Sequence, residues 1–585
     1  MRTEPPFVRT PTHSAGLARW WRLTGSAAIV ALGIVAWAAA GIPVAYEPFT
    51  LPLLAVGVLA LTLTGWPMVL GTFARLGARG PELLPPARDP ASRTAILIPI
   101  HNEDPSRVFA ALRTMRTQVD EIDGLEFFVL SDTRDPAIAA AEEAHYTALS
   151  PLGTPVTYRR RTENTGRKAG NIAEFCDRWG GAFDYMLVLD ADSVMGATAI
   201  ARLIGLMDAN PRAGLLQTVP YIVNRETLHA RVTQFSMRLY TPLWADGAAF
   251  WHGGDGNYWG HNAIIRIAAF MRHATLPVLP GRAPLGGEIL CHDVVEAAFL
   301  RGAGWETWLV PGIADSFEEM PPNMADDAAR DRRWCQGNLQ HIKLLDRAGL
   351  RPSGRLHLFA GIVAYMAAPC WVALMAVLTA MPADAALMTA HALFWPVLTV
   401  FAVPKLCGLL AMLANGRRAA PFGGRVQLTL SMLAEQAIGL VTTPGALLWS
   451  ARFVVTTLAG TVVRWDAQPR ADRGLGWAEA WRKFGWQTLL GAAWGAVLLV
   501  KNPALFDWAG MIVFGLVTTV PVAVWSSRLD IGRLVRRLGL FVTVDEMQPS
   551  PVLRAYRAAA HEPVRPIVTK PIRVAPERTL LTEQP

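Results

Sequence analysis

The chain of 585 residues is short of charge: only 17% of its residues are Asp, Glu, Lys or Arg, while 52% are hydrophobic. This composition excludes a soluble enzyme of ordinary make-up, because the apolar excess is gathered in long uncharged runs. Cysteine is also scarce, and the five cysteines form neither a CxxC pair nor a zinc spacing. We therefore expect reduced, structural thiols. A cleavable signal peptide is not evident, since the first apolar run is too long for one and a second follows at once.

The net charge of +8 at pH 7 is compatible with two kinds of partner, nucleic acid or a membrane surface. Most arginines flank apolar runs, which favours a membrane whose cytoplasmic side carries the basic loops. No nucleic-acid-binding motif is present. We therefore expect contact with membrane lipids and no nucleic-acid partner.

Long apolar runs predict membrane-spanning helices, because about 17–25 apolar residues are needed to cross a bilayer. The unambiguous runs lie near 24–45, 51–73, 356–380, 387–414, 485–501 and 505–526. The region 427–460 is ambiguous: both flanks are basic, so it must cross an even number of times. A turn at Thr442–Gly445 favours two crossings and eight helices in all; the alternative is six helices with a re-entrant or interfacial pair.

The loops and apolar runs together predict an α-helical integral membrane protein with a cytoplasmic α/β domain. We expect a cytoplasmic N-terminus with two transmembrane helices (1–84), the cytoplasmic domain (85–345), further transmembrane helices (346–526) with a cytoplasmic segment at 462–484, and a cytoplasmic tail (527–585). The tail after residue 547 is rich in proline and charge, which predicts disorder.

Within residues 85–345, apolar runs of strand length alternate with helical stretches. The runs are 94–100, 125–132, 156–160 and 185–190, with helices expected near Asp104 and over 168–178. This alternation predicts a parallel sheet with right-handed crossovers. Ligands of such sheets bind at the carboxyl ends of the strands, and those ends carry His101, Asn102, Asp132 and Asp190.

The string YMLVLDADS at 185–193 ends a buried strand with two carboxylates. Asp190 and Asp192 are two residues apart, so in a strand they point to the same face. Such a pair suits Mg²⁺, which takes one or two carboxylates together with substrate phosphates. Alone the pattern is common in surface loops, but its place at the end of a parallel strand favours a metal and diphosphate site.

Seven strings in this order resemble the processive glycosyltransferases of family 2, which have the GT-A fold and include cellulose and hyaluronan synthases. The resemblance is closest to the synthases of osmoregulated periplasmic glucans and covers about residues 25–545. The strings are IPIHNE, LSD ending at Asp132, GRKAGN (166–171), LDAD (189–192), WGHNAIIR (259–266), HDVVEA (292–297) and RDRRWCQGN (330–338).

The resemblance implies UDP-glucose as donor and Mg²⁺ or Mn²⁺ as cofactor. Asp132 would contact the uracil, and Lys168 would face the diphosphate. Asp192 would bind the metal ion, with Asp190 beside it touching metal or ribose. Other readings are a helix cap for Asp132 and a solvated side chain for Lys168.

Asp293 occupies the position of the family's general base, which takes the proton of the acceptor hydroxyl. His292 precedes it where the family has a TED-like motif, and Glu288 or Glu296 could compete for the role. Asp293 could also cap the helix that follows, a role compatible with catalysis.

The family's QxxRW motif is matched by Arg333 and Trp334, but Arg330 stands in place of the glutamine. Arg333 offers a planar fork for phosphate and Trp334 a flat face for a sugar ring; an interfacial helix with basic residues is the alternative. Because Arg330 replaces the glutamine, the hydrogen bonds that this first side chain of the motif forms in the family are in doubt here.

Further acceptor contacts are expected from the aromatic, glycine-rich stretch 251–262, above all from Trp259, with Gln217 as another acceptor-binding residue. An ordinary packed loop is the alternative, and His252 and His261 do not have the spacing of zinc ligands.

The resemblance also places a gating segment at 462–484, where Trp465 and Asp466 are the residues of interest. In the membrane region, Glu435 and Arg452 could line a polymer tunnel or form a buried ion pair.

The resemblance implies a processive, inverting glucosyltransferase of the bacterial inner membrane. It would build a linear β-1,2-glucan backbone and pass the growing glucan chain towards the periplasm. Acyl carrier protein and periplasmic glucan-processing proteins are partners implied in the same way. The alternatives are another β-glucan or exopolysaccharide product, or a membrane transporter or scaffold without catalysis. Linkage cannot be read from the residues, because acceptor orientation decides it.

Overall fold

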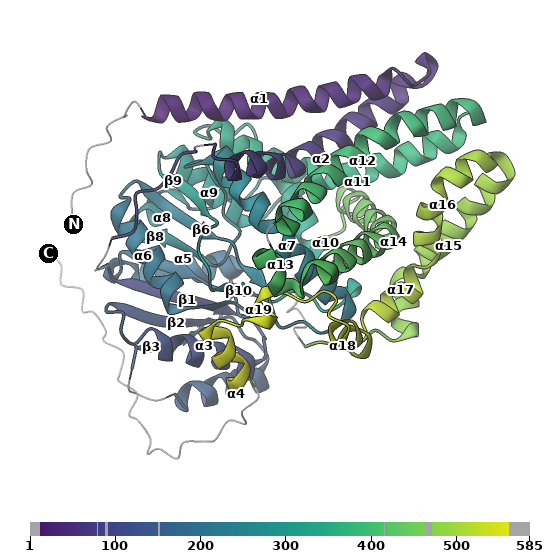
Figure 1. The fold of residues 1–585 in the computed structure, drawn as a ribbon. Helices are drawn as coiled ribbons and strands as arrows, with labels where there is room; N and C mark the ends of the chain where they lie inside the picture. The colour runs from purple at the N-terminus through teal and green to yellow at the C-terminus, as the bar shows by residue number, and fades with distance from the viewer. Residues whose placement is uncertain are drawn as a thin grey trace.

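The computed structural model describes residues 12–78, 80–87, 92–149, 153–414, 416–463 and 471–560. A domain built on a β-sheet lies at one side of the molecule, and a set of long helices extends away from it (Figure 1). Trp465 and Asp466 lie outside the described residues.

The central sheet has seven strands in the order β3-β2-β1-β4-β8-β6-β9. The first four strands in this order are parallel, as the sequence predicts, and β8 runs antiparallel to both β4 and β6. Their bounds are β1 Thr94–Ile100, β2 Leu125–Ser131, β3 Val156–Arg160, β4 Tyr185–Val188, β6 Ala213–Thr218, β8 Ala263–Arg266 and β9 Glu306–Val310. A second, small sheet orders β5 (Val194–Met195), β10 (Ser316–Glu318) and β7 (Tyr221–Ile222).

Helices cover the sheet where the sequence predicts crossovers. Asp104 caps the first of them by accepting a hydrogen bond from the backbone N–H of Ser106 at 2.9 Å. The helices of this domain are α3 Pro105–Gln118, α4 Pro136–Thr147, α5 Arg167–Trp179, α6 Ala197–Ala209, α8 Ile267–His273 and α9 His292–Gly302.

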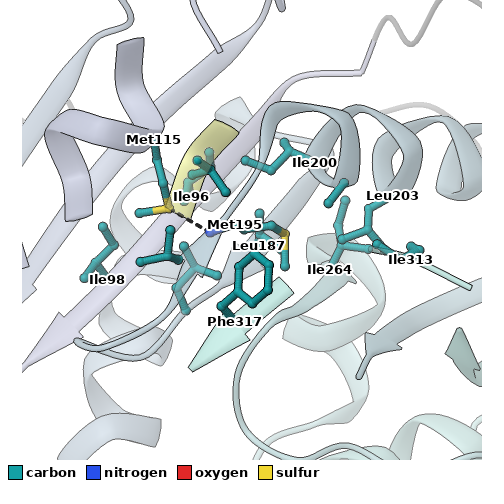
Figure 2. Packing of buried hydrophobic residues seen from close by; sticks show 14 of the residues in the cluster. Ile96, Ile98, Met115, Leu187, Met195, Ile200, Leu203, Ile264, Ile313 and Phe317 are labelled. Atoms are coloured by element: carbon teal, nitrogen blue, oxygen red, sulfur yellow. Dashed lines mark hydrogen bonds between the residues drawn. The ribbon is translucent and has the colours of Figure 1, made fainter. Parts of the chain in front are cut away.

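The core of the domain holds the strand that leads to the paired aspartates. Leu187 on β4 packs among apolar side chains from α3, α6, β8 and β10, including Met115, Leu203 and Phe317 (Figure 2). Leu187 and Leu189 are fully buried, whereas Asp190 is partly exposed. The apolar strand therefore fixes the point at which the carboxylates emerge from the core.

The long helices form the second part of the molecule. Their bounds are α1 Thr12–Ala39, α2 Glu47–Arg75, α11 Pro352–Ala380, α12 Ala383–Leu413, α14 Arg425–Leu458, α15 Trp477–Lys501, α16 Pro503–Val517 and α17 Thr519–Ser526. Among the described residues, four segments are long and apolar enough to cross a membrane: Ala18–Ala39, Val44–Arg75, Pro352–Ala380 and Arg425–Leu458. The pair α16 and α17, bent by 53°, could supply one more span.

The expected division of 427–460 into two helices is wrong. This region forms the single helix α14, and Pro444 lies inside it without ending it. Leu428 near its start packs with Phe235 of the helix Leu228–His252, and Val454 near its end packs with Cys335 of the helix Met324–Gln340. The eight-helix interpretation, which needed a turn here, therefore fails.

Two helices join the parts. Helix α7 (Leu228–His252) lies along α2 at very short distance: a Cβ added at Gly247 would sit 1.6 Å from the carbonyl oxygen of Pro67. Helix α10 (Met324–Gln340) contacts α11 and α14, and Asp331 on it accepts hydrogen bonds from Tyr365 and Ser450 at 2.8 and 3.0 Å.

The C-terminal segment adds three helices: α18 Leu529–Arg537, α19 Val544–Met547 and α20 Pro551–Ala559. Helix α20 packs against α3, so the disorder predicted after residue 547 is wrong for this stretch. Short elements complete the fold: α13 Gly416–Ala419 and four 3₁₀ turns at Val44–Tyr46, Gly180–Ala182, His341–Leu344 and Ala420–Phe422.

Candidate active site

A cavity of about 1350 Å³ opens at the carboxyl ends of β1, β2 and β4. This volume exceeds the roughly 300–1,000 Å³ of most small-ligand pockets, so it has room for more than one ligand. We call its polar lining residues from the sheet domain the polar side: His101, Asn102, Asp132, Lys168, Asp190 and Asp192. We call its aromatic and apolar lining residues from α7, α10 and the loop before β8 the aromatic side: Met237, Tyr240, Trp244, Trp259 and Trp334.

Asp132 is held rigidly after the end of β2. Its two carboxylate oxygens each accept a hydrogen bond of 2.6 Å from the Arg161 guanidinium, and both side chains are buried. The ring nitrogen Nδ1 of His101 lies 2.9 Å from the carbonyl oxygen of Asp132. Asp135, not Asp132, caps α4, so the helix-cap interpretation of Asp132 is wrong.

Lys168 connects two walls of the cavity. Its Nζ forms an ion pair with Asp190 and donates a hydrogen bond of 2.7 Å to the carbonyl oxygen of Gly260. Gly166 directly precedes α5 and has φ +69°, a left-handed conformation that favours glycine. The lysine is therefore a fixed cation inside the cavity, not a freely solvated side chain.

The loop after β4 places the two carboxylates. Ser193 closes a turn: its backbone N–H donates to the carbonyl oxygen of Asp190, and its Oγ accepts from the Asp190 N–H, both at 3.0 Å. Asp192 Oδ2 accepts a bond of 3.3 Å from the backbone N–H of Glu319. Both carboxylates line the cavity.

Within the part of the chain that the structure describes, no group of three or more His, Cys, Asp or Glu side chains is arranged to hold a metal ion. The donor set still fits a hard cation. Mg²⁺ uses one or two protein carboxylates and completes its shell with water and substrate phosphates, and Asp190 and Asp192 supply two such carboxylates.

Two further titratable groups stand beside these carboxylates. His261 Nε2 lies 3.3 Å from Glu318 Oε2. Burial opposes charging of His261, but Asp190 and Glu318 outweigh it and raise the pKa of the imidazole. Burial raises the pKa of the Glu318 carboxyl. Glu318 does not follow from the sequence as part of this site, because the β10 strand that carries it reaches the site only through the small second sheet. His261 lies in the stretch 251–262 that the sequence singles out, but its place beside these carboxylates does not follow from the sequence.

Asp293 lies in the first turn of α9 and lines the cavity. The N-cap of α9 is Cys291, so the helix-cap role considered for Asp293 is wrong. Burial raises the pKa of Asp293, and the neighbouring His292 opposes that rise. His292 is itself held by Glu296, whose Oε1 lies 3.0 Å from the ring Nδ1.

The competing carboxylates are less suited to act as a base. Glu296 is buried against His292 and does not line the cavity. Glu288 does line it, but accepts a bond of 3.1 Å from the Gly166 N–H and lies 3.6 Å from Arg167. Of these three carboxylates, Asp293 therefore remains the candidate base.

The arginine–tryptophan motif lies on α10 at the cavity wall. Arg333 is buried, whereas 45% of Trp334 is exposed. Arg330, which replaces the glutamine of the family motif, places its guanidinium 4.6 Å from the centre of the Trp334 ring and pairs with Asp327 at 2.7 Å. This arginine supports the tryptophan by a cation–π contact.

Gln217 is not in the cavity wall. Its side chain is fully buried; Nε2 donates to the carbonyl oxygens of Thr218 and His261, and Oε1 accepts from the Trp259 N–H at 2.9 Å. The expected contact with an acceptor is therefore wrong, because the amide forms its hydrogen bonds with the backbone, including the loop that carries Trp259.

The face of α7 that meets the cavity carries residues that the sequence does not single out. They recur every three or four positions, as one face of a helix requires: Thr233, Met237, Tyr240, Thr241 and Trp244. The ring centroids of Trp244 and Trp259 are 6.1 Å apart, and Trp244 Nε1 donates to the carbonyl oxygen of Thr64 on α2 at 3.1 Å.

Glu435 and Arg452, which the sequence offers as an ion pair in the membrane region, have different partners. Glu435 on α14 pairs with Lys405 on α12 at 3.2 Å and accepts a bond of 3.3 Å from the Tyr240 hydroxyl. Arg452 instead lies 5.2 Å from the centre of the Trp486 ring. The proposed pair of Glu435 with Arg452 is therefore wrong.

The mixed sheet, the carboxylate pair at its edge and the adjoining long helices define a GT-A-like glycosyltransferase domain joined to candidate membrane spans. The family described as glycosyl transferase family 2 matches residues 95–273, and glycosyl transferase family group 2 matches 185–405. Among solved structures, the chain resembles a mannosyltransferase of Pyrobaculum calidifontis in complex with GDP-mannose and Mn²⁺, at 17% identity and a TM-score of 0.43. That likeness covers 62% of this chain and 97% of the mannosyltransferase.

Curated relatives make the assignment more specific. A glucans biosynthesis glucosyltransferase H of Xanthomonas euvesicatoria pv. vesicatoria is 42% identical over 84% of this chain and 80% of its own length. One of Xylella fastidiosa is 42% identical over 80% of this chain and 77% of its own length. One of Ralstonia nicotianae is 41% identical over 80% of this chain, but the match spans only 57% of that longer protein. The chain belongs to the glucans biosynthesis glucosyltransferase H family.

Proposed function

We propose that the chain is a membrane glucosyltransferase that uses UDP-glucose to extend the linear β-1,2-glucan backbone of osmoregulated periplasmic glucans. The observation that carries this proposal is a single cavity with a cationic and carboxylate-rich side, an aromatic side, and Asp293 in its wall. The name shared by the relatives supports a glucosyl donor and a glucan product.

The polar side binds the donor. Asp132, held by Arg161, accepts the imide N–H of uracil. Lys168 lies where it neutralises the diphosphate. Asp190 and Asp192 would hold a divalent ion, Mg²⁺ or Mn²⁺. When bound, this ion supplies positive charge against which the departing UDP is stabilised.

Asp293 is the general base. It removes the proton of the acceptor hydroxyl while that oxygen attacks the anomeric carbon from the face opposite UDP. The bond between the acceptor oxygen and the anomeric carbon forms as the bond to the UDP oxygen breaks. One displacement converts the α-linked donor into a β-linked product. His292 lies next to the base and limits how far its pKa rises.

The aromatic side binds the acceptor. Trp334 and Trp259 offer flat apolar faces for sugar rings, and Trp244 extends this surface along α7. Arg333 lines the cavity from α10, and its planar guanidinium binds the diphosphate of the donor. Met68 of α2 also lines the cavity, so the cavity borders the long helices towards which a growing chain would pass.

We place the sheet domain in the cytoplasm and the long helices in the bacterial inner membrane, with processive growth coupled to export. The support is the excess of arginine in the loops beside the sheet domain and the availability of UDP-glucose on that side. Membrane lipids surround the helices. Acyl carrier protein and periplasmic glucan-processing proteins are further proposed partners, on family resemblance alone.

The test is linkage analysis of the product that purified protein in lipid makes from labelled UDP-glucose with Mg²⁺ or Mn²⁺. A β-1,2-linked glucan is the expected product, and Asp192→Ala protein is the negative control. A β-1,4-linked or mixed product would show that the chain has a different synthase activity from the one proposed. Absence of labelled glucan and of UDP release in the unaltered protein would overturn the proposal.

A further inference from the structure

The C-terminal helix α20 is part of the sheet domain, although it follows all the long helices in the chain. Val552, Leu553 and Tyr556 are buried in the same core as β1 and β4. At the far end, Arg557 Nε donates a bond of 2.8 Å to Asn224 Oδ1. Figure 1 shows this yellow helix beside α3.

Tyr556 connects α20 to residues near Asp192 in the loop after β4. The Tyr556 hydroxyl oxygen accepts a hydrogen bond from Arg107 on α3. Burial raises the pKa of Tyr556 to about 12, so the hydroxyl stays neutral. Arg107 in turn forms an ion pair with Glu319. The negative charge of Asp192 raises the pKa of both Arg107 and Tyr556.

Glu319 connects this chain of contacts to Asp192. Its side chain is 2% exposed, so its charge has lost water and depends on its cations. Arg225 holds the same carboxylate oxygen from the other side at 2.8 Å. The backbone N–H of Glu319 donates to Asp192 Oδ2 at 3.3 Å. The residue that the two arginines hold by its carboxylate is therefore the same residue whose backbone N–H binds Asp192.

We propose that Arg107 and Tyr556 are positioning residues for Asp192, and that helix α20 thereby helps to set the geometry of the divalent-cation site. Neither side chain touches the donor; both act through Glu319. The inference rests on the proposed function only in that the ion held by Asp190 and Asp192 is the one used with UDP-glucose.

The test measures Mn²⁺ binding directly, by loss of the free Mn²⁺ electron paramagnetic resonance signal when full-length protein in lipid is titrated in the presence of UDP. Arg107→Gln should weaken Mn²⁺ binding by about tenfold, as is typical when a group supporting a metal ligand is removed. Tyr556→Phe keeps the packed ring and removes one neutral hydrogen bond, so we expect roughly a threefold loss. Arg107→Lys should restore part of the binding, because it keeps the charge facing Glu319.

Tyr146→Phe is the matched control, since its hydroxyl donates to the carbonyl oxygen of Val156 away from the cavity. Raising the Mn²⁺ concentration should restore much of the UDP release that Tyr556→Phe loses, which separates a weakened cation site from general loss of structure. Mn²⁺ binding by folded Arg107→Gln and Tyr556→Phe equal to that of the control would overturn the inference. Unaltered protein that binds Mn²⁺ with UDP but transfers no glucose would instead overturn the proposed function.

Discussion

Gly260 lies beside both Lys168 and Asp293 in the cavity wall, and substitution by alanine tests that arrangement. Its φ is +90°, a conformation that side chains rarely adopt, and its carbonyl oxygen accepts the bond from Lys168. A Cβ at this position would lie 3.3 Å from Asp293 Oδ2 and 3.7 Å from Asp293 Cγ. The added methyl would therefore press on the Asp293 carboxylate, the proposed base.

Two effects set the magnitude. The backbone conformation costs about 1–3 kcal/mol for a residue other than glycine. The carboxylate of Asp293 must also give way by a few tenths of an ångström to relieve the 3.3 Å contact. A misplacement of about 1 Å can lower a catalytic rate about 100-fold, so a smaller displacement should lower kcat roughly tenfold. The Lys168 bond to the carbonyl oxygen survives, and KM for UDP-glucose should change little.

The assay is UDP release from UDP-glucose by protein in lipid, with kcat and KM measured separately. Gly181→Ala is the control, because a Cβ there meets nothing within 4 Å. If Gly260→Ala retains the kcat of Gly181→Ala, a methyl at Gly260 does not displace a carboxylate that catalysis needs, and the proposed role of Asp293 beside Gly260 is wrong.

Three further predictions concern the base, the acceptor side and the helices. In the proposed mechanism catalysis requires the ionised form of Asp293. Burial raises the pKa of this carboxyl, and His292 opposes the rise. His292→Gln should therefore raise that pKa further and move the acidic limb of the pH–rate profile to higher pH, whereas an unchanged limb would contradict the coupling. Trp244→Ala should shorten the glucan while leaving KM for UDP-glucose unchanged, as measured by product chromatography; full-length product would exclude this ring from the acceptor path. Glu435→Gln leaves Lys405 without its anionic partner and should lower the thermal stability of the detergent-solubilised protein; an unchanged melting temperature would show that the pair contributes nothing.

The first half of the sheet domain follows from sequence because its signals are local. Apolar runs and intervening helices specify β1 to β4, and the carboxyl ends of these strands bring Asp132 and Asp190 into one cavity. Lys168 and Asp293 were found through motif resemblance, and the structure places both in the cavity wall. Strand register alone would not have selected them.

The acceptor side was predicted less well, since it depends on packing between distant segments. Trp244 reaches the cavity because α7 lies against α2 through close contact at Gly71 and Gly247, which no local pattern indicates. Gln217 has a side chain suited to sugar binding, but its neighbours in the folded chain take up its hydrogen bonds.

Two errors arose from composition. Proline-rich polar sequence predicted disorder after residue 547, yet Val552, Leu553 and Tyr556 recur on one helical face and pack on the core. Pro444 suggested a turn, but proline is tolerated inside apolar helices whose freed backbone groups find other partners. In both cases tertiary packing overrode the local signal.

The central claim is that Asp293 removes the acceptor proton in a glucosyltransferase reaction, and Asp293→Asn tests it most directly. The substitution keeps the size of the side chain and its place in the first turn of α9 while removing the basic oxygen. UDP release from UDP-glucose should fall about 10²–10⁴-fold, the usual contribution of a general base, with UDP binding unchanged. Turnover at the rate of the unaltered protein would contradict the account.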